Sequence, residues 1–69
     1  MLFSKIGNAI KIRRKQLRIT QPDLAEMAEV SVNTLYKIER GQANPTLKVL
    51  EKILTILGME IQIDIKKLQ

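Results

Sequence analysis

The chain has no cysteine and no histidine. Disulfide bonds, thiolate nucleophiles, imidazole bases and zinc fingers are therefore excluded. Its seven acidic residues are scattered, and no base, nucleophile or glycine-rich phosphate loop accompanies them, so we expect no enzyme, metal site or cofactor. No apolar run approaches the roughly 20 residues of a membrane span, and no signal peptide is visible. We therefore expect a cytoplasmic protein with no membrane partner.

What the chain does contain is enough apolar sequence for one small core and an excess of basic charge. It has 69 residues, of which 45% are hydrophobic, near the lower size limit of a single domain. Twelve lysines and arginines against seven acidic residues give a net charge of +5. This balance suits an anionic partner such as nucleic acid. At this length we expect no separate effector-binding or cleavage domain.

Apolar residues recur at helical spacing along most of the chain. The predicted helices cover residues 4–17, 21–28, 32–40 and 47–57. Thr20, Ser31 and Thr46 stand where N-caps belong, and Gly41 and Gly58 stand where glycine ends a helix. A mainly α-helical fold follows.

Residues 59–66, with the sequence MEIQIDIK, alternate apolar and polar side chains, as a half-buried strand does. Leu57, Ile61, Ile65 and Leu68 also fit a helical spacing, but Gly58 and the alternating isoleucines favour a strand. Nothing else in the chain resembles a strand, so the backbone groups of this segment need a partner from elsewhere.

The simplest partner is the same strand of a second chain, running antiparallel about a two-fold axis. A two-stranded ribbon is weak alone, so its apolar side must lie on the fourth helix. We therefore predict a homodimer. A strand folded back on its own domain, or a frayed tail, is the alternative. The predicted dimer interface comprises Leu57, Met59, Ile61, Ile63 and Ile65.

Residues 20–41 contain two short helices around a tight turn. This is a helix-turn-helix, in which the second helix enters the major groove of double-stranded DNA. The side chains predicted to contact bases are Val32, Asn33, Tyr36 and Lys37. Asn33 suits adenine, Lys37 suits the guanine acceptors and Val32 suits a thymine methyl. The alternative is that these residues are polar only because the helix is exposed.

The stretch has the sequence TQPDLAEMAEVSVNTLYKIERG and resembles the helix-turn-helix of phage-repressor-like regulators, the Xre superfamily. Thr-Gln, Leu-Ala, Val-Ser and Ile-Glu-Arg-Gly carry the resemblance, which extends from Ile6 to Gly58. It implies a lambda-repressor-like domain of four to five short helices over residues 1–58. Residues 59–69 would then form the C-terminal β-strand that pairs across the homodimer.

The resemblance also implies roles for residues around the two helices. Gln21, at the start of a helix, would hold a DNA phosphate. Arg14 would pair with Glu39, in a bidentate geometry that suits arginine better than lysine. Glu29 departs from the pattern, because glycine is common at its place in the turn and a positive φ costs other residues about 1 kcal/mol. The phosphate-contacting candidates are Thr20, Gln21, Thr34, Arg40, Gln42 and Asn44.

We therefore expect a sequence-specific transcriptional regulator that represses from a palindromic operator as a dimer. The ending at residues 57–61 also resembles HipB-like antitoxins, which repress their own operon and hold a kinase-like toxin. A repressor of a phage or mobile element is one alternative. A module that neutralises a partner protein without specific DNA binding is another, but the basic recognition helix argues against it.

Overall fold

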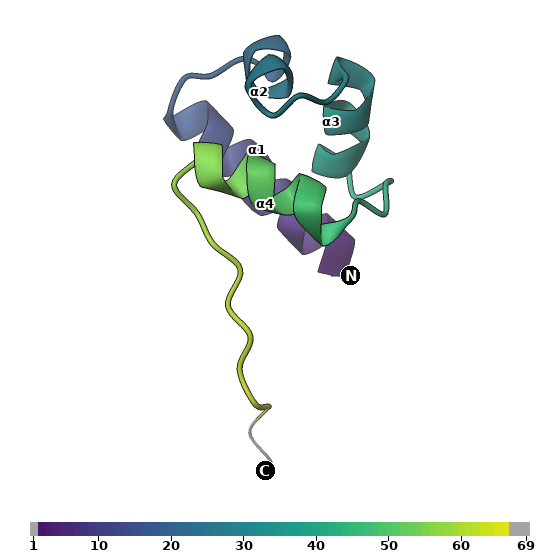
Figure 1. Ribbon diagram of the computed structural model, residues 1–69, viewed down its shortest axis with the longest axis vertical. Helices are drawn as coiled ribbons and strands as arrows, with labels where there is room; N and C mark the ends of the chain where they lie inside the picture. The colour runs from purple at the N-terminus through teal and green to yellow at the C-terminus, as the bar shows by residue number, and fades with distance from the viewer. Residues whose placement is uncertain (1, 67–69) are drawn as a thin grey trace.

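The computed structural model describes residues 2–66, which contain four helices. They are α1 (Leu2–Gln16), α2 (Gln21–Met27), α3 (Val32–Glu39) and α4 (Leu47–Ile56). Figure 1 shows α2 and α3 at the top of the view, above α4 and above α1, which lies behind α4 in this view. The predicted mainly α fold is confirmed. None of the helices in this described range is long and apolar enough to cross a bilayer.

Each helix ends one residue before its predicted end, and α1 begins earlier, at Leu2. The N-caps are as predicted. The hydroxyls of Thr20, Ser31 and Thr46 each accept a hydrogen bond from the backbone N–H three residues later, at 3.0–3.2 Å. These bonds satisfy donors that a helix start otherwise leaves unpaired. Local sequence therefore fixes where α2, α3 and α4 begin.

The four helices also end in the same way, with a residue of positive φ just past the helix. In α2 this residue is Glu29, with φ 58°, whose N–H donates to the Glu26 carbonyl at 3.2 Å. The next N–H, of Val30, donates to the Ala25 carbonyl at 2.9 Å. This pair of bonds is the Schellman motif, which normally uses glycine. The turn thus keeps the geometry that glycine favours, and Glu29 tolerates the strain.

Replacing Glu29 by glycine is expected to raise the free energy of unfolding by about 1 kcal/mol, because the left-handed conformation then costs no steric strain. Urea denaturation followed by circular dichroism measures the change. Glu26→Gly is the matched control. This residue lies within α2, where glycine should lower stability by about 0.5–1 kcal/mol. Destabilisation by both variants would contradict the strain at Glu29.

One apolar core lies among the four helices and contains the side chains that the helical periodicity places inward. Because α3 turns its apolar side to this core, its opposite side must face solvent. The buried apolar residues are Ile10, Leu24, Ala25, Ala28, Leu35, Ile38, Leu50, Ile53, Leu54 and Leu57.

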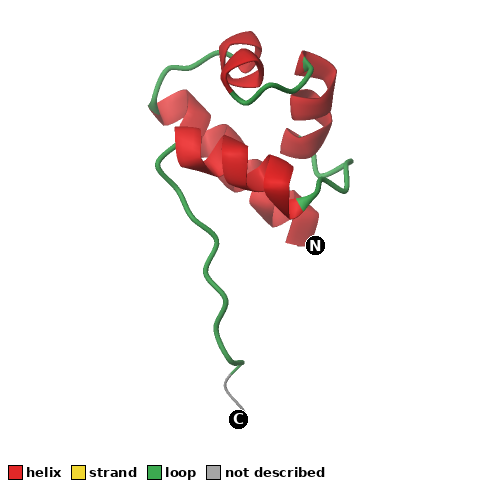
Figure 2. Ribbon diagram, in the orientation of Figure 1, coloured by secondary structure: helices red, strands yellow, loops and turns green. Residues whose placement is uncertain are grey.

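The tail differs from its prediction in two respects. No strand occurs within residues 2–66, and residues 59–66 leave the helical body as a segment without regular structure (Figure 2). A strand needs a hydrogen-bonded neighbour, which a single copy does not supply. Leu57 is fully buried in its own domain, so its assignment to an interface between chains is wrong. The last predicted tail residues, 67–69, lie outside the described residues.

Candidate nucleic-acid interface

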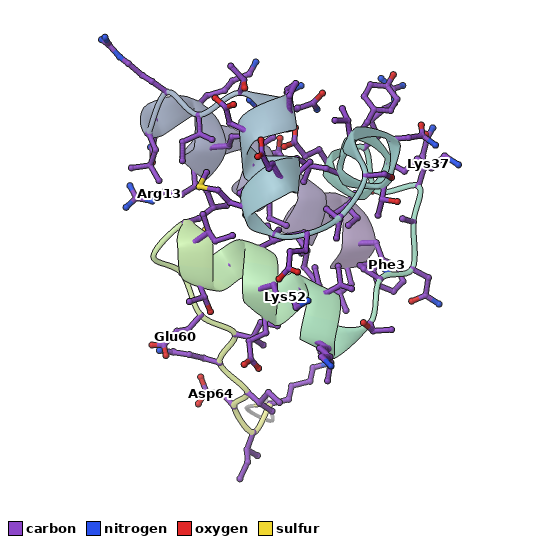
Figure 3. The ribbon with its side chains drawn as sticks, turned by 45° about the horizontal axis from the view of Figure 1, so that its top comes forward. Phe3, Arg13, Lys37, Lys52, Glu60 and Asp64 are labelled. Carbon is purple, nitrogen blue, oxygen red and sulfur yellow. The ribbon has the colours of Figure 1, made fainter. Side chains whose placement is uncertain are left out.

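The outer side of α3 brings the four predicted base-contacting side chains together. Asn33 and Lys37 are exposed, and Figure 3 shows Lys37 extending away from the helical body. Val32 and Tyr36 are each 44% exposed, although both carry large apolar groups. Positions i, i+1, i+4 and i+5 of a helix form one stripe. A recognition helix typically presents about three or four side chains to base edges, and this stripe offers that number.

Arg40 extends this stripe at the end of α3, where it is the C-cap residue. Its guanidinium carbon lies 5.4 Å from the centre of the Tyr36 ring. That distance is within the range of a cation–π interaction. The contact keeps a positive charge beside Tyr36, one turn from Lys37. The exposed side of α3 is therefore basic and polar, as a surface that meets a polyanion must be.

A buried ion pair holds the inner side of α3 to α1. Arg14 donates from Nε to Glu39 Oε2 at 2.7 Å and from Nη2 to Glu39 Oε1 at 3.0 Å. The side chains are 10% and 2% exposed. The hydrogen bond to Glu39 and its negative charge raise the pKa of Arg14 above its ordinary value, although burial acts in the opposite direction. The third arm of the fork, Nη1, donates to the Ile19 carbonyl at 2.9 Å.

Gln21, the first residue of α2, joins the same cluster. Its Nε2 donates to Glu39 Oε1 at 3.0 Å, and its side chain is half-buried. One carboxylate at the end of α3 therefore contacts α1 and the start of α2 together. The angle between the two helices of the motif depends on this cluster as well as on the core.

The remaining phosphate candidates fall into two groups. The hydroxyls of Thr20 and Thr34 are exposed, but both already take part in N-cap hydrogen bonding. Thr20 accepts from the Asp23 N–H, and Thr34 Oγ1 lies 2.8 Å from Ser31 Oγ. Gln42 and Asn44 are exposed in the loop that follows α3. Gln42 and Asn44 follow Arg40 by two and four residues, so their side-chain amides come directly after the C-terminal end of α3 in the sequence.

Two residues that position α3 and α4 were missed by the sequence analysis. Gly7, on α1, is buried where α1 meets the end of α3, and a Cβ there would overlap the Ile38 carbonyl oxygen. A glycine inside a predicted helix was the available signal. Arg13 Nε donates to the Leu57 carbonyl at 3.0 Å and so ties α1 to the end of α4 (Figure 3). No local pattern marks that contact.

The fold and the motif have known counterparts. A family model described as helix-turn-helix matches residues 10–63. The immunity repressor protein of Bacillus phage phi105 is 41% identical over 56 residues, which are 81% of this chain and 39% of that protein. A protein of Methanocaldococcus jannaschii named as an uncharacterized HTH-type transcriptional regulator is 38% identical over 55 residues, covering 80% of this chain and 83% of that protein.

Solved structures agree. The clp gene regulator ClgR from Corynebacterium glutamicum superposes with a TM-score of 0.82 at 29% identity, over 86% of this chain and 63% of that one. The restriction-modification controller protein C.AhdI from Aeromonas hydrophila gives 0.79 at 28% identity, over 84% and 88%. The chain thus spans less than two thirds of the phage repressor and of ClgR. It belongs to the helix-turn-helix family of phage-repressor-like regulators.

Proposed function

We propose that this chain is a sequence-specific DNA-binding transcriptional regulator that represses by binding a palindromic operator as a homodimer. The observation that carries the proposal is the exposed basic stripe on α3, on a helix whose other side is fixed by the core and by the Arg14–Glu39 pair. Relatives named as an immunity repressor and as transcriptional regulators support it.

In this proposal α3 lies in the major groove and its N-terminal half meets the base edges. Asn33 bonds adenine through its amide, Lys37 donates to guanine, and Val32 contacts a thymine methyl. Tyr36 stacks on a sugar or bonds a phosphate. Arg40, with the other phosphate candidates, holds the backbone and fixes the register without reading sequence.

The homodimer is proposed to form through the tail. Ile63 and Ile65 are 92% and 95% exposed in the single chain, and Ile61 beside them is 46% exposed. Apolar side chains that are exposed together in this way mark an interaction surface. Ile63 also lines a groove between α4 and the tail, whose other apolar lining residues include Leu47, Leu54 and Met59. A second copy pairing its own tail there covers these side chains. The two-fold axis then sets two recognition helices about 34 Å apart.

Fluorescence anisotropy tests the DNA proposal, with the protein titrated onto its own upstream DNA and onto a scrambled duplex across a salt series. We expect tight binding to the upstream DNA alone. Two chains carry a formal charge of +10, twice +5, and about six to ten phosphate contacts give a log–log salt slope of roughly −5 to −9. Weak binding that is equal on both duplexes would overturn the proposal and favour a module that neutralises a partner protein.

The antitoxin role, with a kinase-like toxin as partner, has narrower support, because only the ending at residues 57–61 resembles that group. The genes beside this one distinguish the two kinds of regulator. A kinase-like gene directly downstream would favour the antitoxin, and integrase or lysis genes would favour the phage repressor. The DNA contacts proposed for α3 are the same in both.

Asn33→Ala is expected to weaken binding to the operator by about 1–3 kcal/mol, because a bidentate amide contact to a base is lost. On scrambled DNA the same change should have little effect, since random sequence offers no matched base. Anisotropy on both duplexes measures the difference. Asn33 is exposed and makes no side-chain hydrogen bond within the described chain, so the variant should keep its melting temperature. Equal losses on both duplexes would refute base contact by Asn33.

Replacing Ile63 and Ile65 together by lysine is expected to give a monomer in sedimentation velocity. Both side chains are exposed in the single chain, so the change should not disturb the helical domain. Gln62→Lys is the matched control, because Gln62 lies on the other side of an alternating strand. That variant should remain dimeric. A dimer that survives the double isoleucine change would refute pairing through the tail.

A further inference from the structure

Glu39 accepts more hydrogen bonds than an ion pair alone requires. Its Oε1 receives Arg14 Nη2 and Gln21 Nε2, each at 3.0 Å, while its Oε2 receives Arg14 Nε at 2.7 Å. The Glu39 side chain is 2% exposed, and Arg14 of α1 binds its carboxylate. Gln21 reaches it from the start of α2 and remains partly accessible to solvent. The cluster therefore connects the buried Arg14–Glu39 pair to Gln21, at the surface where a phosphate would bind.

The chemistry of Glu39 fixes which end of the Gln21 amide faces inward. An ionised carboxylate only accepts hydrogen bonds, so it selects the NH₂ end of the amide. One of the two N–H groups is then used by Glu39, and the other is directed elsewhere in the plane of the amide. A phosphate also only accepts. The orientation that Glu39 selects therefore leaves a donor available for a second anion.

We infer that Glu39 is a positioning residue for DNA binding, which orients the Gln21 amide to donate to one phosphate of the DNA backbone. This inference rests on the proposed function and deepens it. The buried pair thus has two roles, because Arg14 holds Glu39 and Glu39 in turn holds Gln21. A side chain that is fixed before binding loses less conformational entropy when it meets the phosphate.

The contact should act on all DNA sequences alike, because phosphates carry no sequence information. It should also leave the salt slope unchanged. Glutamine is neutral, and removing Arg14 together with Glu39 removes one positive and one negative charge. Loss of affinity at constant slope distinguishes this effect from loss of a lysine or arginine contact, which lowers the slope.

A double-mutant cycle tests the inference. Gln21→Ala is measured by anisotropy on one scrambled duplex, in the unaltered protein and in an Arg14→Met/Glu39→Met background. In the unaltered protein we expect a loss of about tenfold for each bound protomer, the effect of one charge-assisted hydrogen bond. In the second background we expect less than twofold. Gln42→Ala, outside the cluster, is the control and should cost the same in both.

Each outcome decides a different point. Equal losses for Gln21→Ala in the two backgrounds would overturn the positioning role, as would no loss in the unaltered protein. Absence of sequence-selective binding by the unaltered protein on its upstream DNA would instead overturn the proposed function.

A measurement on the unaltered protein avoids dependence on the folding of the double variant. The Gln21 side-chain NH₂ signals, assigned by their loss in Gln21→Ala, should be shifted from free-glutamine positions before DNA is added. These signals should shift again when duplex DNA is added. Signals at free-glutamine positions in the DNA-free protein would overturn the inference.

Discussion

Replacing Glu39 by methionine is expected to lower the free energy of unfolding by about 3–5 kcal/mol, the effect of leaving one charge of a buried pair without its partner. Removing Glu39 also removes the hydrogen bond and the charge that raise the pKa of Arg14. Arg14 still keeps its charge, because arginine does not lose its proton in proteins, and its side chain is only 10% exposed. A domain of this size has a total stability of roughly 3–10 kcal/mol. The variant should therefore be largely unfolded in moderate urea. Circular dichroism measures it, since the chain has no tryptophan.

The double variant Arg14→Met/Glu39→Met separates charge from packing. Methionine is flexible and fills the space of either side chain, and replacing both partners leaves no unpaired charge. We expect a loss of about 1–2 kcal/mol, because the Ile19 carbonyl and the Gln21 amide lose a partner. Lys15→Met, on the exposed side of α1, should change stability by about 0.5 kcal/mol or less. Equal losses for the single and double variants would contradict the charge argument.

Much of the fold was predictable because its determinants are local. The N-caps Thr20, Ser31 and Thr46 each bond a backbone group three residues away, so the sequence alone locates those helix starts. The same holds for the outer side of α3, since the positions of Leu35 and Ile38 determine which side faces the core. The predicted base-contacting stripe follows from this periodicity.

The hydrogen bonds between helices were harder to predict from the sequence. Arg14 and Glu39 are 25 residues apart, and only the resemblance to repressors suggested their pairing. The bond from Gln21 to Glu39 and that from Arg13 to the Leu57 carbonyl depend on how the helices cross, which no local pattern encodes.

The tail shows a different limit. Alternation in residues 59–66 indicates which sides a strand would have but not where its partner is. In a single copy no neighbouring strand among residues 2–66 bonds the backbone of this segment. The predicted strand can therefore form only when a second chain supplies its partner. Leu57, the residue nearest the domain, was assigned to that assembly although it fills the core. The C-cap position of Leu57 on α4 explains the difference, since the last turn still faces inward.

Two contacts made by α1, the predicted Arg14–Glu39 pair and the close approach at Gly7, determine how α3 is presented. Glu39 fixes α3 to α1 through a charge, and Gly7 allows the two backbones to approach closely. Changes on α1 far from the proposed DNA surface should therefore reach it through α3.

Gly7→Ala is expected to lower the free energy of unfolding by about 2 kcal/mol. The added Cβ overlaps the Ile38 carbonyl oxygen and lies 2.8 Å from that of Glu39. Neither atom belongs to a flexible side chain, so α1 or α3 must shift. Overpacking of this kind costs about 1–3 kcal/mol, and the better helix propensity of alanine returns at most about 1 kcal/mol. In a small domain 2 kcal/mol corresponds to a fall of roughly 8–16 °C in Tm.

The adjacent residue gives a matched control. Asn8 is exposed on α1, so Asn8→Ala gains helix propensity without meeting α3 and should be neutral or slightly stabilising. An unchanged Tm for Gly7→Ala would show that α1 and α3 are not in backbone contact. Because the shift moves α3, Gly7→Ala should also weaken DNA binding at temperatures where it is fully folded. Asn8→Ala should not, and this difference would tie the α1–α3 contact to the presentation of the recognition stripe.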